Sequence, residues 1–138
     1  MDITSGSLKA TSLTVNDFDL DMTSGNTKID NLVANTVNAD LTSGRLEITA
    51  MSVDKFDADI TSGTVVTGFI SLNKATYDMT SGRIDMTLPE SGGVVKVSKT
   101  SGRVNTNREC SVSNNTYAFG TGSADIKVSM TSGTLNIA

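Results

Sequence analysis

The sequence predicts an all-β protein whose fold is a single-stranded parallel β-helix (β-solenoid) with about 19 residues per coil. The tripeptide Thr-Ser-Gly recurs along the chain with its glycine at Gly6, Gly25, Gly44, Gly63, Gly82, Gly102 and Gly133. The first five of these glycines are 19 residues apart. Between the turns, apolar and polar residues alternate with a period of two, which is typical of half-buried strands. The composition also favours strands, because Thr is abundant, Trp is absent and Pro occurs once.

Residues 1–87 form the regular part of the repeat, and the whole of residues 1–138 is expected to be one domain. Each coil should hold about three short strands, which pair in parallel with the equivalent strands of the next coil. We expect a right-handed winding, the usual hand of parallel connections. The columns expected to point inward include Phe18, Val37, Phe56, Ala75 and Val94, the pair Ile70 and Leu72, and the threonines Thr27 and Thr67.

The repeat becomes irregular over residues 88–121. Pro89 stands in a column where earlier coils carry residues such as Leu or Ile, and it predicts a bulged corner. The Asn-rich stretch 113–116 predicts a turn between two short strands. Residues 122–138 regain the register but form a short coil, so we expect them to finish the stack at its C-terminal end.

The repeated Thr-Ser-Gly itself is interpreted as the corner of each coil. A sharp corner often requires a positive φ or a close backbone approach, which glycine tolerates best. Ser and Thr hydroxyls can bond the backbone groups freed there. An outward Thr array could instead bind ice, but a single column does not make the flat two-column face that such binding needs.

Acidic residues form a second column, with Asp or Asn partners two positions earlier. The column holds Asp2, Asp21, Asp40, Asp59 and Asp78, and the partners are Asp19, Asn38 and Asp57. Stacked carboxylates repel one another, so Ca²⁺ is one candidate ligand. The alternative is that these side chains cap turns, face solvent and discourage edge aggregation. Paired acids also occur in glycan-cleaving enzymes, but those need long loops that wall a cleft.

Other ionisable and aromatic side chains give weaker signals. Arg103, placed one coil beyond Arg83, could help a partner to dock, but a solvated face is the better explanation of both residues. An exposed patch of Tyr77, Tyr117 and Phe119 would favour carbohydrate or protein binding.

Charge and composition exclude several classes of function. The net charge is −4 and there is no His, which argues against nucleic-acid binding, a Cys/His zinc site and His-based catalysis. The single Cys110 cannot form an internal disulfide and is expected to be a small, partly buried residue. No apolar run reaches the roughly 18 residues that would cross a membrane. We therefore assign no catalytic, cofactor-binding or metal-binding residue, and predict a protein that is not an enzyme.

The final residues read Gly-Ser-Ala-Asp-Ile-Lys-Val-Ser-Met-Thr-Ser-Gly-Thr-Leu-Asn-Ile at 122–137, and the pattern Asp-Ile/Met/Leu-Thr-Ser-Gly is repeated in the coils before them. In these features the chain resembles the bacterial putative-adhesin β-strand repeat family, a domain of unknown function in envelope-associated proteins. The resemblance covers the whole chain. It implies a β-solenoid that acts as an interaction module or scaffold in the cell envelope or outside the cell, with an unknown protein or glycan partner. A cation-binding or glycan-binding repeat is the alternative function, and a small glycan-active enzyme is a further one.

The beginning of the chain gives one more expectation. Met1 stands in mid-repeat with no capping segment ahead of it, which suggests an excised fragment. An uncapped first coil leaves an open strand edge. We therefore predict that residues 1–20 pair with another molecule, end to end.

Overall fold

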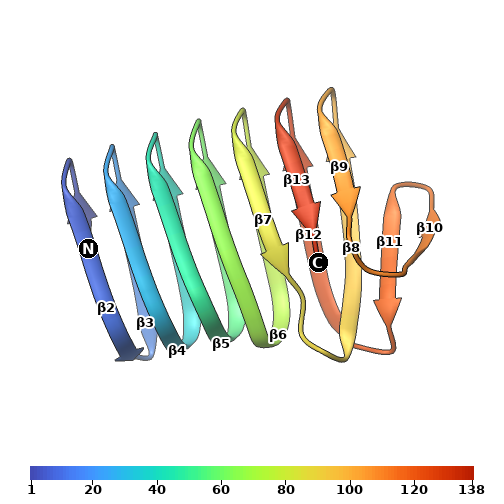
Figure 1. Ribbon diagram of the computed structural model, residues 1–138, viewed down its shortest axis with the longest axis horizontal. Coiled ribbons are helices and arrows are strands. Elements are labelled where there is room, and N and C mark those ends of the chain that lie inside the picture. Colours follow the sequence, from blue (N-terminus) through green and yellow to red (C-terminus); the bar gives the residue numbers. More distant parts are fainter.

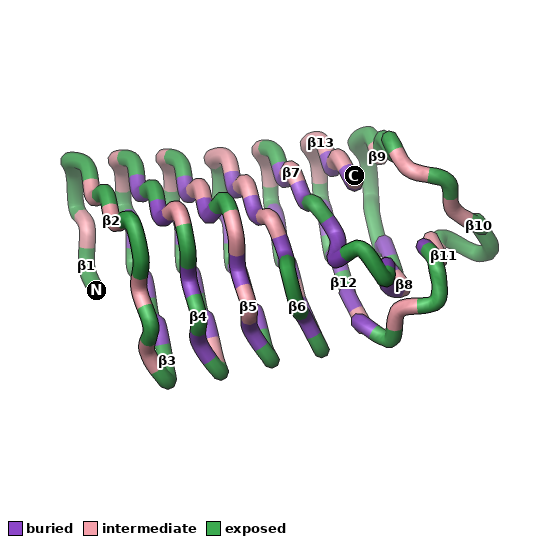
Figure 2. The backbone as a smooth tube through the Cα atoms, turned by 60° about the horizontal axis from the view of Figure 1, so that its bottom comes forward, coloured by how far each residue is buried: buried purple, intermediate pink, exposed green.

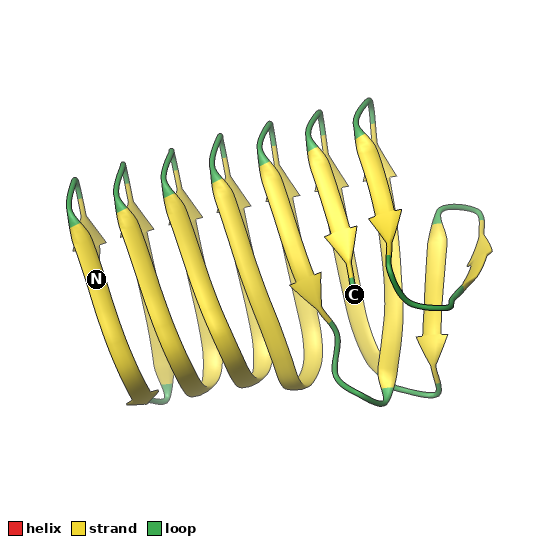
Figure 3. Ribbon diagram, viewed as in Figure 1, coloured by secondary structure: helices red, strands yellow, loops and turns green.

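The computed structural model describes residues 1–138 as one 13-stranded sheet that winds upon itself, with mostly parallel pairing (Figures 1 and 3). The prediction of an all-β chain is confirmed. The strands are β1 (Asp2–Ile3), β2 (Ser7–Thr14), β3 (Asp17–Met22), β4 (Asn26–Leu41), β5 (Arg45–Ile60), β6 (Thr64–Met79), β7 (Arg83–Thr87), β8 (Gly92–Lys99), β9 (Arg103–Thr106), β10 (Ser111–Ser113), β11 (Thr116–Gly120), β12 (Ala124–Met130) and β13 (Thr134–Ile137).

Three strands, β4, β5 and β6, each run for 16 residues through a whole layer of the stack. In Figure 1 each descends at the front, bends at the bottom and returns behind to the next turn. Residues paired between β4 and β5 are 19 positions apart, as in the pair Asp40 and Asp59. Two pairs of consecutive unburied residues, at 30–31 and 35–36, divide the alternation of β4 into three runs. The three expected short strands are therefore present as runs, but no loops separate them.

The inward columns meet in a single core of 34 buried apolar residues (Figure 2). Thr27 and Thr67 are buried among them, as the columns predict. The first coil is less covered, because its Ile3, Leu13 and Val15 have a neighbouring layer on one side only and are partly buried. Pairing of residues 1–20 with another molecule stays a prediction.

Two inward assignments are wrong by one residue. Ile70 is 64% exposed and Phe69 is 4% exposed, so Phe69 fills the core position that was assigned to Ile70. The cause is a register shift in the β5–β6 pairing, where Met51 faces Phe69. The preceding Gly68 permits the shift, since a Cβ there would lie 2.2 Å from the carbonyl oxygen of Thr49.

The second case lies in β8, where the repeat interval is one residue longer. Val95 is buried and Val94 is only partly covered. Val95 continues the inward column through Ile126 to Ala75.

The order of the layers in space differs from their order in the chain. Strand β12 lies between β6 and β8, and β13 lies between β7 and β9 (Figure 1). Residues 122–138 are therefore not a finishing coil but an interior layer. Arg103 is likewise not the neighbour of Arg83, because Thr134 lies between them.

The apolar side chains explain this order. The interior layer is apolar in every inward column, and Met130, Leu135 and Ile137 are at most 3% exposed. The layer that contains β8 and β9 carries Lys99 and Thr106 in the matching positions, and both are exposed. A fully apolar layer gains most from cover on both sides, whereas a layer with a lysine suits the end of the stack.

A hairpin covers part of that end. Strands β10 and β11 pair antiparallel around Asn114 and Asn115, whose φ angles are 47° and 61°. Asn tolerates positive φ better than most residues, which explains the Asn-rich turn. The predicted turn at 113–116 is confirmed, and β11 pairs antiparallel with β8 beyond it (Figure 3).

Candidate functional site

The seven Thr-Ser-Gly turns stack into one ridge along the edge of the molecule. In space the turn at 131–133 lies between those at 80–82 and 100–102. In every turn after the first, the Ser hydroxyl donates a hydrogen bond to the Thr carbonyl of the adjacent turn, at 2.8–3.2 Å. The glycines have φ angles of 110–141°. A Cβ on Gly82 would lie 2.3 Å from the carbonyl oxygen of Gly63. The ridge thus holds the layers together, and the Thr side chains at its crest are exposed as a single row.

The acidic column runs beside this ridge on the returning strands. Its five Asp residues are successive ladder partners. Desolvation, followed by repulsion from Asp40 and Asp2, raises the pKa of Asp21 above its ordinary value. One layer away, the Asn38 amide donates to Asp19 at 2.7 Å and so offsets part of the acidic charge. The structure contains no group of three or more His, Cys, Asp or Glu side chains that could hold a metal ion.

A polar groove of about 470 Å³ crosses the last four layers between the acidic column and the ridge. It is lined by Asp59, Ile60, Thr61, Asp78, Met79, Thr80, Ser98, Lys99, Thr100, Ser129, Met130 and Thr131. In the groove, Ser residues replace Asp in the positions of the acidic column. Ser129 is the ladder partner of Asp78, and Ser98 is the ladder partner of Ser129. Their short side chains leave more open space than Asp would. The groove therefore has carboxylates at one end, hydroxyls along its length and Lys99 at the other end.

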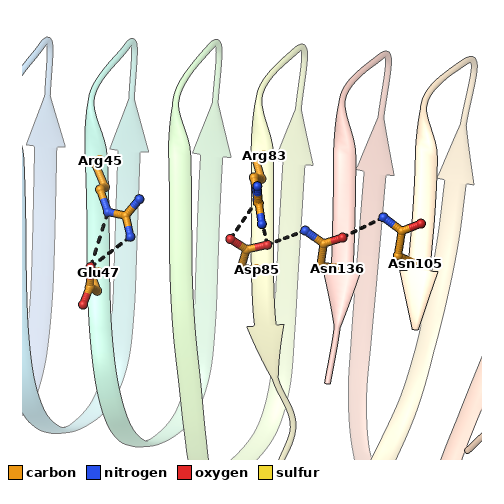
Figure 4. A network of polar contacts seen from close by, with 6 residues as sticks. All are labelled: Arg45, Glu47, Arg83, Asp85, Asn105 and Asn136. Atoms are coloured by element: carbon orange, nitrogen blue, oxygen red, sulfur yellow. Dashed lines mark hydrogen bonds and ion pairs between the residues drawn. The ribbon is translucent and has the colours of Figure 1, made fainter. Parts of the chain in front are cut away.

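Ionic and amide contacts lie on the opposite, descending face, and the amide contacts join neighbouring layers (Figure 4). Lys28 of the neighbouring layer and Arg45 of the same strand both bind Glu47, at 3.0 and 3.1 Å, and these contacts hold the pKa of Glu47 below its ordinary value. Arg83 binds Asp85, which accepts a hydrogen bond from the amide of Asn136.

The row continues into the next layer, because Asn105 donates to Asn136 at 2.8 Å. It therefore crosses β7, β13 and β9 in their spatial order (Figure 4). The repeat pattern of the sequence did not predict this row. Asp85, Asn136 and Asn105 become neighbours only because β13 lies between β7 and β9. The cationic partners of these ion pairs are about half exposed, so each pair adds little stability.

The aromatic side chains do not form a surface patch. Tyr77 and Phe119 are at most 1% exposed, and Tyr117 is partly buried. The Tyr77 hydroxyl is 2.8 Å from that of Thr67, and its ring is 5.2 Å from that of Phe56. Burial raises the pKa of Tyr77 above its ordinary value. Exposed aromatic rings therefore do not mark a binding face, and the polar groove is the better candidate. Cys110 is partly buried, as expected.

Comparisons with known proteins identify one family. The model of a family described as Toastrack DUF4097 matches residues 1–138. No curated protein matches the sequence. A solved structure, described as a putative cell adhesion protein from Clostridium sporogenes, is 15% identical with a TM-score of 0.45. That alignment covers 98% of this chain and 92% of the other, and a similarity at this level transfers no function. None of the structural elements is a helix long and apolar enough to cross a membrane.

Proposed function

The chain belongs to the Toastrack DUF4097 family, and we propose that it is a non-enzymatic interaction module of the cell envelope or cell surface. In this proposal the fold is a right-handed β-solenoid with coils of about 19 residues, the usual hand for parallel connections. The stack serves as a rigid scaffold, and its outer face presents the same side-chain positions once per layer.

The groove of about 470 Å³ beside the Thr-Ser-Gly ridge is the observation that carries this function. Its hydroxyls repeat at the spacing of neighbouring strands, about 4.8 Å. A ligand that lies along the stack would therefore meet a new hydroxyl at every layer. This favours an extended, polar ligand, such as a glycan chain or an extended peptide.

The charge pattern supports binding without catalysis. The two carboxylates of the groove, Asp59 and Asp78, lie in adjacent layers of an open surface. The connections around them are the short turns of the ridge, which do not wall a cleft. A glycosidase needs its acid and its second carboxylate on either side of an enclosed bond.

Binding to the groove can be tested with soluble polysaccharides in affinity gel electrophoresis and with isolated bacterial envelopes in sedimentation assays. Ser129→Trp fills the groove from an exposed position, and Thr23→Trp adds the same ring to the ridge outside it. Retardation or co-sedimentation that Ser129→Trp abolishes and Thr23→Trp preserves supports the proposal. Equal binding by both variants, or no binding of the wild-type chain to any envelope or glycan, contradicts it.

A further inference from the structure

The interior layer formed by β12 and β13 is held by ladders on both sides and joins the rest of the described chain through Gly120–Ser123. We propose that this layer, residues 122–138, is exchangeable between molecules. The slot between β6–β7 and β8–β9 accepts the same segment from a second copy, so that two chains exchange it reciprocally.

Every backbone contact that holds the layer can be made by a second copy in the same way. On one side, Thr131, Ser132 and Thr134 donate to the layer below at 2.9–3.0 Å. On the other side, Thr100, Ser101 and Arg103 donate to carbonyls of the layer at 2.9–3.0 Å. None of these contacts depends on which chain supplies the segment.

The slot is selective for its occupant. A Cβ on Gly133 would lie 2.4 Å from the carbonyl oxygen of Gly82, and one on Gly102 would lie 2.5 Å from that of Gly133. The occupant therefore needs glycine at this point. It also needs apolar side chains on both sides of the turn, because Ile126, Val128 and Leu135 are at most 1% exposed.

Side-chain amides add a second requirement. Asn136 donates to Asp85 and accepts from Asn105, and so it connects the two walls of the slot (Figure 4). The segment that combines this amide with the required glycine and apolar columns is 122–138 itself. A second copy of the chain is thus the partner that fits.

The linker can redirect the segment. Gly120 has a φ of +60°. Thr121 and Gly122 both donate to the carbonyl of Ser91, at 3.1 and 2.7 Å. These are the only backbone hydrogen bonds outside the strands that hold the linker. Two glycines and two bonds to one acceptor make it a low-cost hinge for exchange.

Exchange is tested with full-length chains in a Cys110→Ser background. One chain carries Asp78→Cys and the other carries Ser129→Cys, because these residues are ladder partners across the β6–β12 boundary. Neighbouring strands lie about 4.8 Å apart, within the Cα range of a disulfide. The two chains are mixed, unfolded in urea, refolded together, oxidised and separated on a non-reducing gel. A matched control mixes Asp59→Cys with Asp78→Cys, which are partners between two consecutive layers that the linker does not separate.

The proposal predicts several-fold more covalent heterodimer for the 78 and 129 mixture than for the control mixture, and none without the unfolding step. A single chain with both Asp78→Cys and Ser129→Cys shows that the disulfide can form. The pair Arg83→Cys and Thr134→Cys repeats the test at the β7–β13 boundary. Heterodimer no more abundant than the control at both boundaries overturns the proposal.

Discussion

Replacing Gly82 by Ala tests the idea that the Thr-Ser-Gly ridge is held by close backbone stacking. Gly82 has a φ of +126°, and its new Cβ would lie 2.3 Å from the carbonyl oxygen of Gly63. Gly6 has a similar φ of +116°, but a Cβ there meets nothing within 4 Å. The two alanine variants therefore share the cost of the backbone conformation and differ in the steric contact.

The magnitudes follow from these two contributions. An alanine held in a sparsely populated φ region costs about 1–3 kcal/mol. Overpacking adds about 1–3 kcal/mol or more, because the Arg83 to Gly63 ladder bond of 2.9 Å must lengthen to relieve the contact. We expect Gly6→Ala to lower the free energy of unfolding by about 1–3 kcal/mol and Gly82→Ala by about 2–6 kcal/mol. The larger value is a substantial part of a domain's total stability of about 5–15 kcal/mol.

Urea denaturation followed by circular dichroism measures both values, provided that the slope of each transition is unchanged. Thr4→Ala and Thr80→Ala are the controls, since both remove exposed Thr side chains from the same two turns. Any difference in stability loss between these two control variants measures how much less a turn at the end of the stack contributes than an interior turn. If Gly82→Ala and Gly6→Ala lose equal stability after this correction, close stacking does not hold the ridge.

Four further substitutions test the core and the acidic column. Thr27 has a buried hydroxyl without a hydrogen-bond partner, so Thr27→Val should raise the free energy of unfolding by about 1 kcal/mol and shift the urea midpoint upward. A lower midpoint would contradict this. Thr67→Val and Tyr77→Phe each leave the other hydroxyl unpaired in the core, at a cost of about 1–3 kcal/mol. The double variant should lose less than the sum, and strict additivity in the cycle would show that the two hydroxyls do not interact. The raised pKa of Asp21 means that its charge opposes folding above that pKa and that the penalty disappears as the pH falls through it. Asp21→Asn should therefore raise Tm at neutral pH but not at about pH 3, and an equal gain at both would exclude electrostatics.

Periodicity predicted the columns of this fold well, because the same physical requirement acts in every layer. A residue such as Phe56 or Ala75 must be apolar wherever equivalent strands stack, so its column could be read directly. Ile70 was wrongly assigned to the core in place of Phe69 because both residues are apolar, and the choice between them depends on the close approach of Gly68 to Thr49. That contact joins two strands and leaves no periodic signal.

The order of the layers was harder to predict, since periodicity shows which residues share a column but not which layers are neighbours. One signal was present in the sequence. Lys99 stands in a column that holds Met79 and Met130 in other layers, and a charged residue there suits the end of the stack. The groove could not be predicted for the same reason, because the segment 129–131 lies between Asp78 and the segment 98–100 only after the insertion.

The interior position of β13 also decides how the molecule bears mechanical load. A force applied at Met1 acts on β1 and β2, whose outer edges have no neighbouring layer, so coils can peel away one after another. A force applied at Ala138 acts on a strand bonded on both edges, to β7 and to β9, and both ladders must break together. The two ends of the chain therefore respond differently to force: the strand at the C-terminus resists tension, and the strands at the N-terminus separate first.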